Sequence, residues 1–432
     1  MKKTFNINSR FFIILYLMLA LLFVGCDGVY FGRTATPLFE DAKSSTPSPF
    51  PTTEILTTEN PENSNPLHTG RISEIQQFCL RPENLPSVIE TEPNSVFIVS
   101  AYNENQDYFW DFESKEATAL PFSQVGYKAF GGKISPNRYW ISFEVNRIDD
   151  NGNVIERKLA ILDALGQSKT AMSWEKNWGI LRGWLDNDNI YIEGYETPLG
   201  TIFSIEPFVG TTKELTPTFT NIYNDYPPAI WSNVPNSDLT LMLYPNSASA
   251  EEGIGYTLWD IEARKRIWHE DSRIAPSVPP QWSSDYKSFA VNIAMDPIQD
   301  HSEIFVFNNL GQMISQTDFG AKYSSVFVSR YMSWSPDGRY IAVWLGLGTE
   351  NNQPEHPSLV LIDLNEGKAI DYCLQSFGVG SDIIWSNGGK WLITRPDDIG
   401  SNVLIDISDN KAYRIPLPID GTINGWMTKS DP

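Results

Sequence analysis

The sequence predicts an all-β fold made of repeated four-stranded units. A short phrase recurs along the chain: a tryptophan, a polar turn and then an apolar strand. Its clearest copy is Trp334-Ser-Pro-Asp-Gly338, in which proline, aspartate and glycine suit a tight turn between two strands. The tryptophans of this phrase follow one another at intervals of 47, 51, 52 and 51 residues. They are Trp184, Trp231, Trp282, Trp334 and Trp385.

Each phrase is followed by a second apolar strand that ends in an aspartate or a turn, as in residues 359–363, and then by a polar outer strand, as in residues 265–268. Four short antiparallel strands cannot bury both faces of their sheet alone, so successive units must stack radially. We therefore predict a β-propeller of seven four-stranded blades. The earliest copies of the phrase are degenerate, with Ile134 in the tryptophan position, which leaves six or eight blades as alternatives.

The last copy of the phrase, residues 423–427 with Trp426, has no strands after it. This predicts a C-terminal strand that joins the first blade, residues 89–120, and closes the ring. Closure removes the exposed sheet edge that an open ring would carry.

The Trp-Ser-Pro-Asp-Gly phrase and its following strand resemble the WD40-like propeller repeat of the TolB type. The resemblance extends over about residues 88–427 and is sharpest at 334–343. It implies a noncatalytic binding protein. We interpret the recurrent tryptophans as wedges between blades, each burying about 150–250 Å². The alternative is that they form a platform for stacking sugars, which would require exposed rings.

The N-terminus has the pattern of a secretory signal. Three basic residues, Lys2, Lys3 and Arg10, flank the start of an unbroken apolar stretch at 11–24, which is shorter than the roughly 20 residues of a membrane span. The stretch ends in Leu22-Phe-Val-Gly-Cys26, which resembles the lipoprotein box of bacteria. We predict a signal peptide at 1–25 and lipidation of Cys26, which would hold the chain on the extracytoplasmic side of a cell membrane or envelope. An uncleaved signal anchor, or cleavage with Cys26 incidental, are the alternatives.

Residues 26–70 are rich in Pro, Ser and Thr, and we expect a disordered linker between the anchor and a propeller domain at 71–432. Once Cys26 carries a lipid, Cys79 and Cys373 are the remaining cysteines. In an oxidising compartment two cysteines suggest a disulfide, and two separately buried thiols are the alternative.

Composition and motifs exclude several functions. The net charge is −21 and no basic cluster lies beyond the N-terminus, which argues against nucleic acid as a partner. With only four histidines, and without a hydrolase, zincin or nucleotide-binding motif, the sequence assigns no catalytic, cofactor or metal residue.

The loops between the second and third strands of the blades should gather on one face of the ring. As estimated from the sequence, they hold fifteen Asp or Glu residues, two Arg and no Lys. The prominent acids are Asp149, Asp150, Glu251, Glu252, Asp296, Asp300, Glu350, Asp397 and Asp398. They form either a solvated rim that keeps the protein soluble or a face for a cationic ligand, a basic partner or Ca²⁺.

These observations predict a monomeric, membrane-anchored propeller that binds a protein, peptide or glycan. The alternative is a carbohydrate-active enzyme that uses acidic residues at the mouth of the central channel, because two carboxyl groups suffice for glycoside hydrolysis. A third hypothesis is a structural protein that binds other proteins and no small ligand, and such a protein would present a flat apolar face.

Overall fold

The chain, seen in a computed structural model, divides into two units, Met1–Asn60 and Pro61–Pro432. All described residues belong to the second unit, so the predicted signal peptide, Cys26 and the linker up to residue 66 lie outside them. The structure describes residues 67–81, 85–88, 91–102, 106–122, 127–175, 178–194, 202–214, 234–246, 255–263, 265–271, 278–296, 301–349, 356–377 and 382–429.

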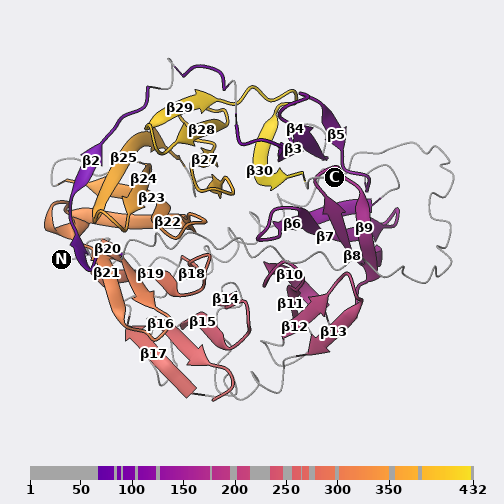
Figure 1. Ribbon diagram of the computed structural model, residues 1–432, viewed down its shortest axis with the longest axis horizontal. Coiled ribbons are helices and arrows are strands. Elements are labelled where there is room, and N and C mark those ends of the chain that lie inside the picture. Colours follow the sequence, from indigo (N-terminus) through magenta and orange to yellow (C-terminus); the bar gives the residue numbers. More distant parts are fainter. Residues whose placement is uncertain are drawn as a thin grey trace, which may run out of the picture. The chain divides into compact units, whose positions relative to one another are not determined.

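Within the second unit, the described chain is almost entirely β-strand, and its sheets surround a common centre (Figure 1). Five of these sheets are separate and have four antiparallel strands each. The first comprises β30 (Gly421–Thr428), β3 (Ser95–Ala101), β4 (Asp107–Asp111) and β5 (Ala117–Ala119). The second comprises β6 (Tyr127–Ile134), β7 (Trp140–Ile148), β8 (Val154–Asp163) and β9 (Ser168–Ser173).

The other three separate sheets repeat this order of strands from the centre outward. One holds β10 (Trp178–Trp184), β11 (Ile190–Gly194), β12 (Ile202–Glu206) and β13 (Thr211–Glu214). The next holds β14 (Val234–Pro235), β15 (Leu241–Asn246), β16 (Gly255–Asp260) and β17 (Lys265–Asp271). The last holds β26 (Ile384–Trp385), β27 (Trp391–Thr394), β28 (Val403–Asp406) and β29 (Lys411–Arg414).

The remaining ten strands form one sheet. It contains β18 (Gln281–Trp282), β19 (Ser288–Asp296), β20 (His301–Asn308) and β21 (Met313–Thr317), followed by a 3₁₀ turn, η3 (Phe319–Ala321). It continues with β22 (Ser325–Trp334), β23 (Tyr340–Gly348), β24 (Ser358–Asp363) and β25 (Lys368–Gln375), and it includes β1 (Gly70–Ile72) and β2 (Ile75–Gln77). The all-β fold and the propeller arrangement are thus confirmed. Seven separate four-stranded sheets are not found: five are separate, and a parallel bridge between His301 and Val326 merges the strands from β18 to β25.

The ring is closed by the C-terminal strand, as the sequence predicted. Strand β30 pairs antiparallel with β3, opposing Trp426 to Phe97. The Trp426 ring is fully buried and lies 5.0 Å from the Phe97 ring, centroid to centroid. The same hydrophobic cluster includes Trp391 and Leu404 of the preceding sheet. The closing strand therefore joins the first and last sheets through a shared core.

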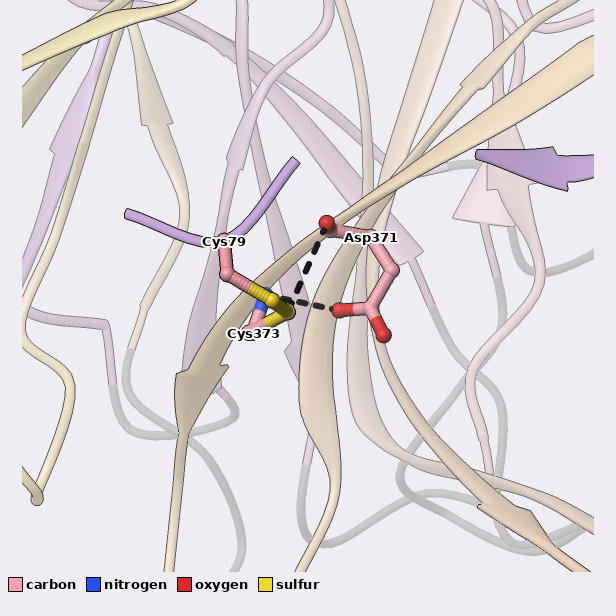
Figure 2. The surroundings of a disulfide bond; sticks show 3 residues. All are labelled: Cys79, Asp371 and Cys373. Atoms are coloured by element: carbon pink, nitrogen blue, oxygen red, sulfur yellow. Dashed lines mark hydrogen bonds between the residues drawn. A yellow bond between two sulfur atoms is a disulfide. The ribbon is translucent and has the colours of Figure 1, made fainter. Parts of the chain in front are cut away.

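An N-terminal segment that the sequence did not distinguish runs along the outer edge of the last sheets. This N-terminal strap, residues 67–81 and 85–88, pairs in parallel with β21 through β1 and with β25 through β2, and a parallel bridge joins Ser87 to Arg414 of β29. A disulfide joins Cys79 of the strap to Cys373 of β25, with their Cα atoms 4.8 Å apart (Figure 2). Asp371 accepts a 2.8 Å hydrogen bond from the backbone N–H of Cys373, which has a left-handed φ of 56°. The two cysteines that the sequence suggested as partners are therefore bonded.

The recurrent tryptophans are buried and connect neighbouring repeats. Among the described ones, Trp184, Trp282, Trp334, Trp385 and Trp426 are at most 7% exposed, which suits wedges and not a sugar platform. The indole N–H groups of Trp184 and Trp282 donate to the carbonyl oxygens of Lys133 and Val234, both at 2.8 Å. Each indole thus reaches the innermost strand of the preceding repeat.

The repeat near residue 231 has a different register from the one the sequence suggested. Trp231 lies outside the described residues. In this repeat β14 ends at Pro235, and the Asn236 side chain accepts a 2.8 Å hydrogen bond from the Leu241 N–H. In the clearest repeat Ser335 accepts the equivalent bond from Tyr340, also at 2.8 Å. Pro235 therefore occupies the position that tryptophan holds elsewhere, because asparagine replaces serine as the residue that organises the turn.

Candidate functional site

The antiparallel sheets give the ring two different faces. The turns that join first to second strands, and third to fourth strands, lie at one end of the sheets, which we name the turn face. The connections between second and third strands lie at the other end, the loop face. On the turn face, aspartates at the ends of the third strands cap their own turns: Asp363 accepts hydrogen bonds from the N–H groups of Asn365 and Glu366 at 2.9 and 3.0 Å. The strand-ending aspartates in the sequence are thus turn-forming residues.

The turns on this face are bonded to one another around the ring. The Asn137 N–H donates to the Asn187 side chain at 2.8 Å, and the Tyr286 hydroxyl donates to the Leu185 carbonyl at 3.3 Å. The Arg138 guanidinium, in the turn between β6 and β7, donates to the Trp426 carbonyl of the closing strand at 3.2 Å. Burial lowers the pKa of Arg138 to about 10. These polar groups of the turn face therefore link neighbouring parts of the ring.

On the loop face, two of the predicted acidic residues are structural. Asp149 accepts hydrogen bonds from the N–H groups of Asn151 and Asn153 at 2.9 and 2.8 Å, and these bonds, led by that from Asn153, lower its pKa. Asp397 accepts from the Phe377 N–H at 2.7 Å and from the Ser376 hydroxyl at 3.0 Å. Both carboxylates therefore hold loops in place.

Of the other predicted acids, two have side chains within the described residues, Asp150 and Asp398. Asp150 is exposed, and burial raises the pKa of Asp398. Glu251, Glu252, Asp300 and Glu350 lie outside the described residues, as does the side chain of Asp296 at the end of β19. Within the described ranges, no group of three or more His, Cys, Asp or Glu residues is arranged to hold a metal ion.

Charged side chains of the second, third and last sheets lie close to one another on or beside their inner strands. The Arg182 guanidinium donates to the Glu193 carboxylate at 2.6 Å. Lys133 stands on β6, and Asp382 lies two residues before the short strand β26. Burial raises the pKa of Glu193, although Arg182 opposes the shift, and burial also raises the pKa of Asp382, against the effect of Lys133. These two carboxyl groups are the acid–base candidates that the enzyme alternative requires.

A pocket of about 560 Å³ opens between the first and second sheets on the loop face. Its volume falls within the range of roughly 300–1,000 Å³ that small-ligand sites occupy. Its wall combines aromatic and aliphatic side chains with a carboxylate, an amide and an ammonium group. The lining residues are Ser100, Ala101, Gln106, Asp107, Leu120, Phe122, Tyr127, Lys128, Ala129, Phe130 and Ile148.

Hydrogen bonds fix the polar wall of this pocket. The Asn424 amide of the closing strand β30 donates to the Ser100 hydroxyl, which donates to Oδ1 of Asp107. On the opposite wall, the Tyr127 hydroxyl donates to Glu156 at 2.5 Å. One residue of this site, Asp107, belongs to the first of the acidic loops predicted from the sequence, residues 103–107. Nothing in the sequence linked Asp107 to Tyr127, because different sheets carry them.

In the described ranges, no helix is long and apolar enough to cross a membrane. No family model matches the chain, and no curated protein matches it.

Solved structures with a similar course of the chain share little sequence with it. A chain of the mitotic checkpoint complex is 15% identical, with 81% of this chain and 92% of that chain covered and a TM-score of 0.45. Dihydro-heme d1 dehydrogenase NirN is 13% identical, with 82% of each chain covered and a TM-score of 0.45. Hydrazine synthase of Kuenenia stuttgartiensis is 13% identical, covering 67% and 78% with a TM-score of 0.43. At this level of similarity they carry no conclusion about activity or ligand.

Proposed function

We propose that this chain is a lipid-anchored, extracytoplasmic propeller of the WD40-like, TolB type that binds a protein, peptide or glycan through its loop face, as a monomer and without catalysis. The observation that carries the proposal is the pocket between the first and second sheets. The difference between the two faces of the ring also supports the proposal. Polar groups of the turn face bond blades to one another, whereas the pocket wall on the loop face presents polar groups to solvent.

A seven-bladed count follows if the ten-stranded sheet is treated as two blades. The strands β18 to β21 form one antiparallel run, and β22 to β25 form another. Only the bridge between His301 and Val326 joins β20 to β22, and the strap supplies the two remaining strands. Adding these two blades to the five separate sheets gives the number that the repeat spacing predicts.

The membrane anchor and the extracytoplasmic location rest on the sequence. A basic start, a short apolar stretch and Cys26 directly after a glycine together form a lipoprotein signal. The disulfide between Cys79 and Cys373 agrees with an oxidising compartment. A tether of this kind would present the propeller to partners at the cell surface or in the envelope.

The binding function is tested with a photo-crosslinking residue placed in the full-length chain in its own cells. One variant carries the residue at Gln106 in the pocket, and the control carries it at Ser114, an exposed position on the turn face. We expect a discrete adduct from position 106 and none from position 114. Adducts of equal yield from both positions, or none from position 106, would contradict binding at this pocket.

The enzyme alternative is favoured by one observation, the raised pKa values of Glu193 and Asp382. Carboxyl groups with raised pKa values can serve as general acids. If the chain hydrolyses glycosides, Glu193→Gln or Asp382→Asn should abolish the release of reducing sugar while leaving the fold intact. Absence of hydrolysis by the wild-type chain on the oligosaccharides that it binds would eliminate this alternative.

A further inference from the structure

We propose that the pocket between the first and second sheets takes a neutral glycan. This inference rests on the proposed binding function and specifies its ligand. A sugar ring is amphipathic, with C–H groups on its faces and hydroxyl groups at its edge. A site for it therefore needs an apolar ring beside hydrogen-bonding side chains that still have free capacity.

The pocket meets this requirement with residues from both sheets. Tyr127, at the start of β6, contributes an aromatic ring that is partly buried against the core shared with the first sheet. Opposite it, Asp107 has only its Oδ1 atom engaged within the described structure, by Ser100, which leaves Oδ2 to accept further bonds. The neighbouring Gln106 lines the same pocket with an amide that can both donate and accept. Asp107 and Gln106 therefore supply hydrogen-bonding capacity for the hydroxyl groups of a sugar.

The strand pairing around the pocket limits where an extended peptide can add to a sheet. Binding a peptide by strand addition requires an unpaired sheet edge. Strand β3 is paired on both sides, by β30 and β4, and β4 is paired by β3 and β5. Strand β7 is likewise paired on both sides, by β6 and β8. These three strands offer a ligand side chains and no main-chain edge. Among the described strands β6 is paired only by β7, so strand addition at this pocket is limited to the edge of β6.

Charge indicates that the glycan is neutral. Among the described lining residues, the carboxylate of Asp107 is balanced by the ammonium group of Lys128. The whole chain has a net charge of −21, which repels glycans that carry uronic acids, sulfates or phosphates. A ligand without charge avoids both this repulsion and the desolvation of an ionic group.

The experiment is isothermal titration of the purified full-length chain, in detergent micelles, with hexasaccharides of glucose, mannose, galactose and xylose and with a galacturonic acid hexamer as the anionic probe. We expect at least one neutral hexasaccharide to bind and the anionic one not to bind. Tyr127→Ala and Asp107→Asn should each raise the Kd for the neutral hexasaccharide by about tenfold or more. The first change removes the stacking surface, and the second removes a charged hydrogen-bond acceptor. Tyr127→Phe, which keeps the ring, should bind within a factor of about three of the wild type.

The matched control is Asp150→Asn, the same change on the same face at an exposed position that does not line the pocket. It should leave the affinity unchanged, and Gln106→Ala provides a second pocket variant if the melting curve shows that Tyr127→Ala is unfolded. A wild-type chain that binds no neutral hexasaccharide, or that binds the anionic one better, overturns the inference. If position 106 still crosslinks to a protein, the proposed binding function survives that result. Binding that Asp107→Asn and Gln106→Ala both leave intact overturns the assignment to this pocket.

Discussion

The indole N–H of Trp334 donates a 3.1 Å hydrogen bond to the carbonyl oxygen of Gln281, which lies 53 residues earlier in the chain. One repeat thus holds the innermost strand of the repeat before it. Trp385 is equally buried, but its indole nitrogen has no hydrogen-bond partner in the described structure. Comparing the two tryptophans therefore separates the contribution of the indole hydrogen bond to stability from that of the buried aromatic ring.

Trp334→Phe should destabilise the protein more than Trp385→Phe. Both changes shrink a buried aromatic ring, whereas only the first leaves a buried carbonyl oxygen without its donor. We expect the difference between the two losses to be about 1 kcal/mol, measured by urea unfolding of the full-length chain. Equal losses would show that the inter-repeat hydrogen bond contributes nothing.

Removing the disulfide should loosen the N-terminal strap. Cys79→Ser breaks a crosslink between residues 294 positions apart, and we expect a loss of about 3 kcal/mol in the free energy of unfolding. The double variant Cys79→Ser/Cys373→Ser serves as the control and should lose no more than the single variant. An unchanged unfolding midpoint in the single variant would show that the paired strands of the strap suffice without the crosslink.

Truncating the side chain of Trp426 should open the ring. The indole of Trp426 is buried between Phe97 and the core of the last sheet. Trp426→Ala should therefore lower the free energy of unfolding by about 3–5 kcal/mol. Thr428→Ala, on the same strand but half-buried, should cost less than about 1 kcal/mol. Deleting residues 423–427 should have a larger effect than either change, and a deletion that leaves the melting curve unchanged would contradict the role of β30 as the closing strand.

The ion pair between Asp111 and Lys429 should make ring closure sensitive to acid. Burial opposes ionisation of Asp111, but the Lys429 ammonium at 2.6 Å and the N–H groups of Ser114 and Glu113 outweigh it and lower its pKa. A carboxyl group whose pKa is lower in the folded state stabilises that state above its ordinary pKa of about 4, and the contribution disappears as the pH falls through the folded value.

Asp111→Asn should therefore cost about 1 kcal/mol at neutral pH. The difference from the wild type should shrink toward zero as the pH falls below about 4. Urea midpoints measured across this range check both statements. A difference that stays constant with pH would mean that the variant acts through packing and not through charge.

The lipid anchor is tested by metabolic labelling with a fatty acid. The wild-type chain should incorporate the label, and Cys26→Ser should abolish the incorporation. Cys79→Ser, which changes a cysteine of the folded unit, is the control and should label normally. Label that persists in the Cys26→Ser variant would refute the anchor.

Local features of the fold were predictable from the sequence because each repeat carries its own signals. The turn after Trp334, the strand that follows it and the aspartate at 363 are all set within one stretch of chain. The register at Pro235 was missed because Asn236 replaces the usual serine and tryptophan is absent from the position. A short-range sequence pattern identifies a strand or turn only where the residue types typical of the repeat occupy its positions.

The strap and the pocket were not predictable because they depend on distant residues. Strands β1 and β2 have three residues each, too few for an alternating pattern, and they pair with strands more than 240 positions later. The bridge between His301 and Val326, which merges two repeats into one sheet, leaves no local signal either. Likewise, Asp107 and Tyr127 line one pocket only because neighbouring sheets pack together.

The strap has a consequence for how the chain reaches its final structure. The strap leaves the ribosome before any blade, yet its partners β21, β25 and β29 all lie in the C-terminal third of the chain. The first blade likewise waits for β30 at the C-terminus. During synthesis, therefore, the strap stays unpaired until β21 has been made, and the sheet that contains β3 is completed only when β30 has been made. Contacts of such long range make folding slow, and they make an emerging chain dependent on factors that protect unpaired strand edges.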